Sequence, residues 1–94
     1  MVVTVRYFAA ARAAAGVTEE TVALPAAGPE TGTGTGTARP TVGAVVAAAA
    51  ERRPGLARVL PRCSFLLDEV AVHEPDTPVR PGQVLDVLPP FAGG

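Results

Sequence analysis

The side chains that most often carry chemistry are scarce in this chain of 94 residues. Cys63 is the only cysteine and His73 the only histidine, which excludes an internal disulfide framework, a zinc finger and a four-thiolate iron–sulfur site. Cys63 is expected to pack as a small hydrophobic residue, and His73 is expected at the surface. Asp68 and Glu69 are adjacent, which is typical of a solvated turn rather than of paired catalytic carboxylates. We therefore expect neither a metal site nor an active site built from side chains.

The basic residues narrow the possible functions further. All eight are arginine, and the absence of lysine excludes a Walker phosphate loop, a Schiff-base enzyme and a lysine general base. The net charge of −1 gives no electrostatic footprint for nucleic acid. The glycines of the segment 25–40 do not match a dinucleotide-binding fingerprint, so this Gly/Thr-rich segment is expected to be a flexible loop.

The chain terminus is the one group whose setting suggests chemistry. Two prolines, an aromatic residue and a Gly-Gly end follow the last predicted strand, which ends at Leu88. Prolines favour an extended path, and glycines suit a passage where a partner approaches the backbone closely. Six extended residues span roughly 20 Å. The segment 89–94 is thus predicted to be an extended tail that presents the carboxylate of Gly94 to the active site of a partner.

The first elements that position this tail are a strand and a short helix. Apolar residues alternate from the N-terminus, which predicts a strand that buries Val3, Val5 and Tyr7 and places Phe8 on the opposite face. An alanine-rich helix from residue 9 to 15 is expected to stop at Gly16. A second strand is predicted over 18–24.

One longer helix follows the glycine-rich segment. Thr41 is predicted to cap it and Pro54 to end it. Its buried stripe, at helical spacing, comprises Val42, Val45, Val46 and Ala49. A short connector is expected over 55–61.

Three further strands complete the predicted fold. They are expected at residues 64–67, 70–72 and 83–88, with a type II turn before the last, at Arg80-Pro81-Gly82-Gln83. The last strand should bury Leu85 and Val87. This order predicts an α+β protein, a single domain over residues 1–94, in which one main helix packs on one face of a mixed sheet. It is the order of the ubiquitin-like β-grasp fold.

Strands one and five are neighbours in a β-grasp sheet, which places Phe8 and Leu88 close together on the outer face. An exposed apolar patch of this kind often marks a protein interface. We therefore predict a partner-binding surface at the root of the tail. Its residues are Phe8, Leu88, Pro89, Pro90, Phe91, Ala92 and Gly93.

Two segments, VTVRYFAAARAAAG near the start and LDVLPPFAGG at the end, resemble the MoaD/ThiS family of sulfur carriers. The likeness is strongest to small subunits of molybdopterin synthase and covers nearly the whole chain except the Gly-Thr segment. It implies that Gly94 is adenylated by an adenylyltransferase of the ubiquitin-activating type, which uses ATP and magnesium. Sulfur from a persulfide donor then makes a thiocarboxylate, which the large synthase subunit uses to build the dithiolene of the molybdenum cofactor. By this resemblance the chain itself binds no cofactor and is not catalytic alone.

Other functions remain open at this point. The same carrier chemistry serves thiamine thiazole, cysteine and secondary-metabolite synthesis. A ubiquitin-like modifier would instead join Gly94 to a lysine of a target protein, and a plain interaction domain would use no covalent chemistry. We expect a cytoplasmic protein, since the sequence has neither an apolar stretch long enough to span a membrane nor a signal-peptide pattern.

Overall fold

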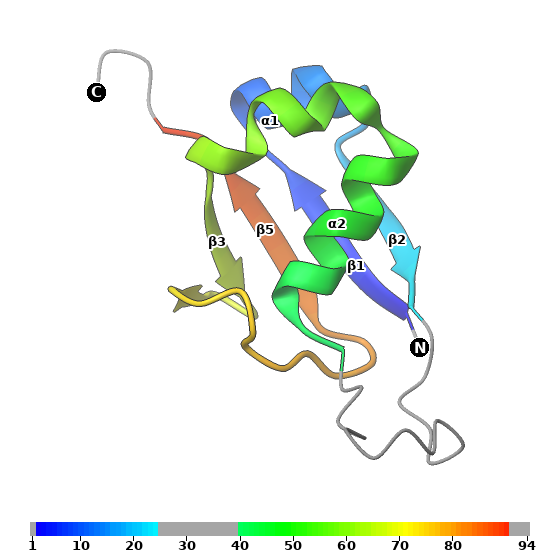
Figure 1. The fold of residues 1–94 in the computed structure, drawn as a ribbon, viewed down its shortest axis with the longest axis vertical. Coiled ribbons are helices and arrows are strands. Elements are labelled where there is room, and N and C mark those ends of the chain that lie inside the picture. Colours follow the sequence, from blue (N-terminus) through cyan, green and yellow to red (C-terminus); the bar gives the residue numbers. More distant parts are fainter. Residues whose placement is uncertain (1, 25–39, 91–94) are drawn as a thin grey trace.

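A computed structural model describes residues 2–24 and 40–90 and shows a five-stranded sheet with helices on one face (Figure 1). The strand order across the sheet is β2-β1-β5-β3-β4. Two short 3₁₀ turns, Pro54–Arg58 and Leu60–Arg62, connect the longer helix to the third strand. The elements are β1 (Val2–Tyr7), α1 (Ala9–Ala15), β2 (Glu19–Ala23), α2 (Val42–Arg52), β3 (Ser64–Leu67), β4 (Val70–Val72) and β5 (Val84–Leu88).

The first and last strands lie side by side at the centre of the sheet. β5 runs parallel to β1, with Tyr7 opposite Val87, and antiparallel to β3, with Ser64 opposite Leu88. A parallel pair requires a crossover connection, and α2 supplies it by crossing the front of the sheet in Figure 1. This arrangement confirms the predicted mixed sheet with one main helix on one face.

The core lies between α2 and the covered face of the sheet and is made mainly of small side chains. Val3, Val5 and Tyr7 are buried, as the alternation in β1 predicts. Val42, Val45 and Ala49 of the predicted stripe are also buried, whereas Val46 is half-buried at its edge. Leu56 and Leu60 anchor the two 3₁₀ turns beneath this layer, so the connector is more regular than expected.

Local signals set the ends of the helices. The hydroxyl of Thr41 accepts a hydrogen bond from the backbone N–H of Ala44 at 3.1 Å, which confirms the predicted cap of α2. Gly16 ends α1 in the left-handed conformation with φ 82°, and its N–H donates to the carbonyl of Arg12. Gly82 has φ 85° and the N–H of Gln83 donates to the carbonyl of Arg80, as in the predicted type II turn.

The strand boundaries differ only slightly from the sequence-based prediction, whereas the burial of one side chain was not foreseen. β2 is one residue shorter at each end than predicted, and β5 begins one residue later. Asp86 does lie on the face opposite the core, but it is buried, with 5% of its surface exposed. The reason is an ion pair described below. The predicted flexible loop lies outside the described residues except at Pro40.

No helix within the described residues is long and apolar enough to cross a membrane.

Candidate functional site

The candidate site begins where β5 ends, because the chain leaves the sheet there toward its C-terminus. β5 has a neighbour on both sides, so Leu88 is held in the middle of the sheet rather than at an edge. The N–H of Phe8 donates to the carbonyl of Val87 at 3.2 Å and extends the β1–β5 pairing by one step. The point from which the terminal segment departs is therefore rigid.

The apolar surface predicted at this point is present in its described part. Phe8 is 39% exposed, and the β1–β5 register places it next to Leu88. Leu88 and Pro89 are half-buried and Pro90 is exposed. The other members of the predicted surface, Phe91, Ala92 and Gly93, lie outside the described residues, as does Gly94.

The uncovered face of the sheet carries an ion pair between its two central strands. Arg6 of β1 donates from Nε to Oδ1 of Asp86 at 2.6 Å and from Nη2 to Oδ2 at 2.9 Å. This two-point contact lets the carboxylate of Asp86 be buried on a face that no helix covers. The hydrogen bond to Asp86 raises the pKa of Arg6, so the guanidinium stays charged.

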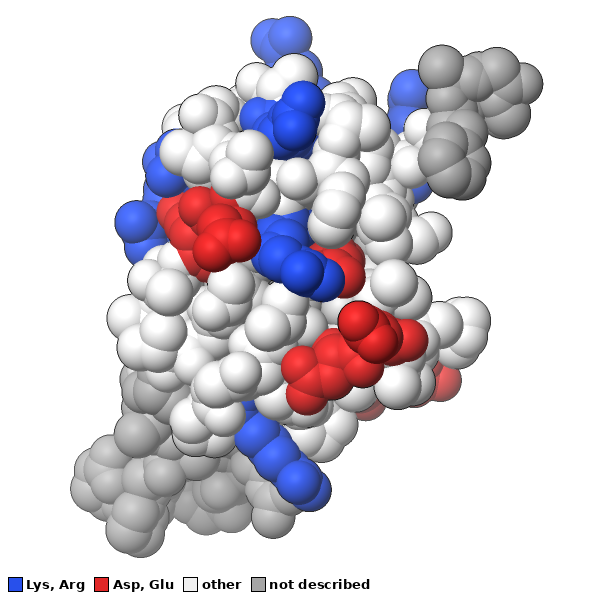
Figure 2. All heavy atoms as spheres, turned by 180° about the vertical axis from the view of Figure 1, so that it is seen from behind, with Lys and Arg blue, Asp and Glu red and all other residues white. Residues whose placement is uncertain are grey.

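The same arginine connects the ion pair to the apolar surface. Its guanidinium lies 5.9 Å from the centre of the Phe8 ring, within the range of a cation–π contact. Figure 2 shows this face of the molecule, where basic and acidic side chains meet in the middle and a further acidic cluster lies just below them. Arg6 thus links the buried carboxylate of Asp86 to the exposed ring of Phe8 beside Leu88.

The hairpin between β3 and β4 is fastened to the start of β5. Asp68 and Glu69 both have positive φ, at 48° and 70°, which gives the turn the twist that a two-residue hairpin needs. The carboxylate of Asp68 accepts from the N–H of Val84 at 2.9 Å and from the Gln83 amide at 3.0 Å. These hydrogen bonds, first that of Val84, lower the pKa of Asp68. The solvated turn is confirmed, and Asp68 has an anchoring role that the sequence did not indicate.

A buried carboxylate supports the site from the helix side. Glu20 accepts from the hydroxyl of Tyr7 and from Nε of Arg53 at 2.9 Å, and its side chain is 7% exposed. Arg53 also donates to the carbonyl of Ala15 at 2.9 Å. The group therefore joins β1, β2 and the ends of α1 and α2. Burial alone would raise the pKa of Glu20, but the hydrogen bonds from Arg53 and Tyr7 lower it overall, while burial raises the pKa of Tyr7.

The two rare side chains lie where the sequence placed them. His73 is exposed after β4. Cys63 packs against the core, and its thiol donates to the carbonyl of Val59 at 3.2 Å. Burial raises the pKa of this thiol, which favours the unreactive protonated form. Within the described residues no cluster of His, Cys, Asp or Glu could hold a metal ion.

Besides the anchoring role of Asp68, three features escaped the reasoning from sequence. The Arg6–Asp86 pair and the Glu20 group join residues 80 and 33 positions apart, so no local pattern reveals them. Val70 is 67% exposed on β4, the outermost strand. Its short strand and neighbouring turn were the only signal of an edge position.

Solved structures of known proteins share this fold over nearly their whole length. Small archaeal modifier protein 1 from Haloferax volcanii aligns with a TM-score of 0.79 and 20% identity, and the alignment covers 100% of both chains. A putative molybdopterin converting factor subunit 1 from Pyrococcus furiosus aligns with a TM-score of 0.75 and 22% identity over 97% of this chain and 99% of that one.

A third structure is a complex of subunits 1 and 2 of the molybdopterin-converting factor from Helicobacter pylori, with a TM-score of 0.61, 22% identity and full coverage of both aligned chains. At these identities the likeness establishes the ubiquitin-like β-grasp fold. A search of curated proteins by sequence gives no match.

The sequence itself supplies the assignment to a family. The profile of the ThiS family matches residues 33–94, which is most of the chain and includes both β5 and the terminal glycines. The chain therefore belongs to the ThiS family, within the MoaD/ThiS group of ubiquitin-like sulfur carriers.

Proposed function

We propose that this protein is the sulfur-carrying small subunit of a molybdopterin synthase and that Gly94 is its reacting residue. The observation that carries the proposal is the position of β5. This strand is fixed at the centre of the sheet, beside exposed Phe8, and it leads directly into the family-matched Gly-Gly end. A rigid base with an apolar surface suits a subunit that docks on an enzyme and delivers its terminus.

The chemistry takes place on the terminal carboxylate. A carboxylate oxygen of Gly94 attacks the α-phosphorus of ATP on a ubiquitin-activating-type adenylyltransferase, magnesium assists, and pyrophosphate leaves. The terminal sulfur of a persulfide donor then attacks the carbonyl carbon, and AMP leaves. The product is an acyl disulfide between Gly94 and the donor. A second thiol then attacks the donor's own thiol sulfur, forms a disulfide with it and releases the thiocarboxylate.

The proposed recipient is the large subunit of molybdopterin synthase, where the thiocarboxylate transfers sulfur to a cyclic pterin precursor. The Helicobacter pylori complex of subunits 1 and 2 supports a partner of this kind, because its small subunit shares the fold. In that setting this chain contributes the sulfur and the docking surface, and the partner contributes the catalytic side chains. No cofactor is proposed to reside in this chain, and we propose that it works in the cytoplasm.

Two alternatives follow from the comparisons. The ThiS family match keeps open a sulfur carrier for another pathway, such as thiamine thiazole, cysteine or secondary-metabolite synthesis. The fold shared with small archaeal modifier protein 1 favours a ubiquitin-like modifier joined through Gly94 to a target lysine. All three use the same terminal carboxylate.

The deciding experiment is mass spectrometry of the C-terminal peptide from protein isolated with its native cellular machinery. We expect one oxygen of Gly94 to be replaced by sulfur, localised by fragmentation because oxidation of Cys63 changes the intact mass almost equally. An isopeptide bond at Gly94 would establish the modifier instead. A plain carboxylate that persists with activating enzyme and ATP would contradict both.

Two further tests separate the remaining functions. Appending one alanine after Gly94 should abolish sulfur loading while the fold is retained, whereas a plain interaction domain would keep its function. Reconstitution with the large subunit and the cyclic pterin precursor tests the pathway. A loaded carrier that yields no dithiolene product there would move the assignment to another sulfur pathway.

A further inference from the structure

β4, the outer strand of the β3–β4 hairpin, has backbone groups that form no hydrogen bond within the described residues. β4 pairs with β3 alone, and the two-residue turn makes Leu67 and Val70 a hydrogen-bonded pair. By the alternation of an antiparallel ladder, Ala71 turns its N–H and C=O away from β3. No hydrogen bond to these groups exists within the described part of the chain. Beside them, Val70 is 67% exposed, more than Phe8.

The opposite edge of the sheet is different. There β2 is the outer strand, and the pairing of Tyr7 N–H with the carbonyl of Thr18 makes Glu19 and Thr21 residues whose backbone groups face outward. Nη1 of Arg52 donates to the carbonyl of Thr21 at 3.2 Å and covers that group. Within the described residues the β4 edge has no such cover, and it is the more available of the two for pairing with another strand.

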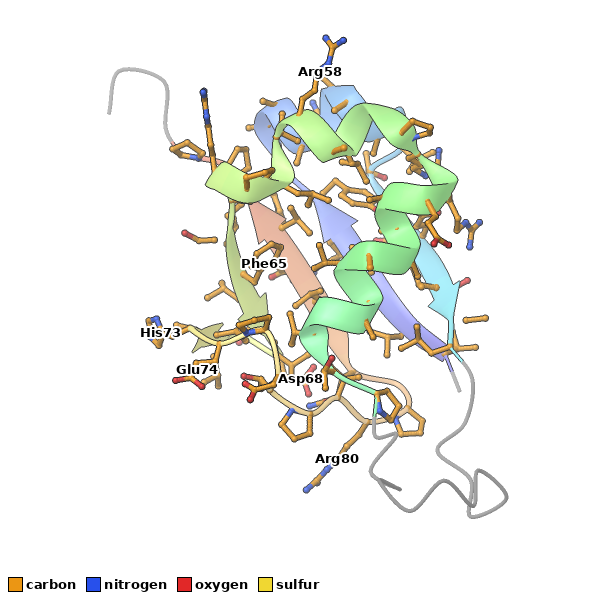
Figure 3. All side chains as sticks on the ribbon, viewed as in Figure 1. Arg58, Phe65, Asp68, His73, Glu74 and Arg80 are labelled. Carbon is orange, nitrogen blue, oxygen red and sulfur yellow. The ribbon has the colours of Figure 1, made fainter. Side chains whose placement is uncertain are left out.

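An apolar groove accompanies the free edge. It has a volume of about 420 Å³ and runs between α2 and the β3–β4 hairpin. Figure 3 shows Phe65 on β3 beside α2, and it shows His73 and Glu74 in the segment that follows β4. Its apolar lining includes Val42, Val46, Phe65 and Val72.

Exposed carboxylates gather around this edge. Glu74 lines the groove, and Glu69 and Asp76 are exposed on either side of it in the sequence. None of these carboxylates forms an ion pair within residues 2–24 and 40–90. Arg6 lies near Glu69, but a cationic partner would still gain charge interactions with Glu74 and Asp76.

We propose that the β4 edge binds an extended, cationic peptide segment of a partner protein by strand addition. Its backbone pairs with the outward N–H and C=O of Ala71. The peptide side chains opposite Val70 and Val72 face the groove and should be apolar. The peptide side chains that alternate with them should be basic. This interaction uses a different strand from the proposed Phe8–Leu88 surface and holds whether or not Gly94 carries sulfur.

The test is an NMR titration of the full ¹⁵N-labelled chain with acetyl-(Val-Lys)4-amide at low salt. We expect saturable binding with the largest amide shifts at Ala71, Val72 and along the groove. Acetyl-(Val-Glu)4-amide serves as the control peptide of the same alternation and opposite charge, and it should not bind. Raising the salt concentration should weaken the binding of the cationic peptide.

Two matched pairs of variants sharpen the test. Ala71→Pro removes the outward N–H of β4 and should weaken peptide binding by about fivefold or more, whereas Thr21→Pro removes the equivalent group of β2 and should leave it unchanged. Glu74→Gln should weaken binding by about twofold, and Glu51→Gln, which removes a charge from the exposed side of α2, should not. If Ala71→Pro does not fold, Val70→Ser replaces it, because it removes an exposed apolar contact without adding charge and should also weaken binding.

Several results would overturn the proposal. These are absence of saturable binding, equal affinity for the anionic peptide, and shifts centred on Phe8 and Leu88 or on β2. A dimer of the free chain in sedimentation that Ala71→Pro makes monomeric would identify a second copy as the occupant instead of a cationic peptide.

Discussion

Arg6 and Asp86, eighty positions apart in the sequence, form a two-point ion pair across the parallel strands β1 and β5, with distances of 2.6 and 2.9 Å. The pair lies on the face of the sheet that carries no helix, next to the exposed ring of Phe8. It fastens the two strands that hold the base of the terminal segment. The partner-binding surface and the stability of the central sheet are therefore connected through one arginine.

Asp86→Asn tests the contribution of this pair to stability. The amide keeps the shape of the carboxylate but offers one acceptor oxygen and no charge. We expect the melting temperature to fall by a few degrees, and the difference from the original chain to shrink at high salt, since Arg6 is partly exposed. Asp76→Asn, an exposed carboxylate without an ion pair, is the control. Equal melting temperatures for the two variants would show that the pair contributes nothing.

Glu20→Gln tests the buried group behind the site. The substitution leaves Arg53 and the Tyr7 hydroxyl without their charged acceptor, and we expect a loss of about 2 kcal/mol in the free energy of unfolding. Urea denaturation measures it. The matched control is Glu19→Gln, whose side chain is exposed and forms no ion pair within residues 2–24 and 40–90, and it should change stability little. A similar loss in both variants would contradict the assigned role.

The stability difference between the original chain and Glu20→Gln should depend on pH and should shrink in acid. The pKa of Glu20 is lower in the folded protein than its ordinary value of 4.5. Its contribution to stability is therefore fully present above that ordinary value and is lost as the pH falls through the lowered folded value. The difference in unfolding free energy between the original chain and Glu20→Gln should shrink in that acidic range. A constant difference down to the acid transition would show that the pKa of Glu20 is not lowered.

Phe8→Glu tests the surface beside Leu88. Phe8 is largely outside the core, so the fold should remain intact and circular dichroism should not change. Affinity for the large subunit of molybdopterin synthase should fall by about tenfold, as expected for an aromatic residue at an interface. Val2→Glu places the same charge at an exposed apolar residue at the other end of β1 and should leave affinity unchanged. Unchanged affinity of Phe8→Glu would remove this surface from the interface.

Cys63→Ala separates carrier chemistry from thiol chemistry. The thiocarboxylate is proposed to form on Gly94 alone, so sulfur loading measured by mass spectrometry should continue in the variant. Because burial raises the pKa of the Cys63 thiol, iodoacetamide should alkylate the native protein more slowly than the unfolded protein. Loss of loading in a folded Cys63→Ala variant would show that this thiol takes part.

Local patterns in the sequence were sufficient for the elements and their covered faces. The alternation at Val3, Val5 and Tyr7, the cap at Thr41 and the stop at Gly16 depend on neighbours within one or two turns, and each is confirmed. The Gly-Gly end, which carries the proposed chemistry, is likewise visible in the sequence alone, and the family match includes it.

The tertiary structure decided which polar side chains are buried and which edges are free. The partners of Arg6, Asp86 and Glu20 lie on distant strands and helices, and only folding brings the opposite charges together. In the same way, the exposure of Val70 follows from the position of β4 at the end of the strand order, which no property of its own three residues sets. Sequence determines what a segment prefers locally, whereas long-range pairing determines what each side chain finally contacts.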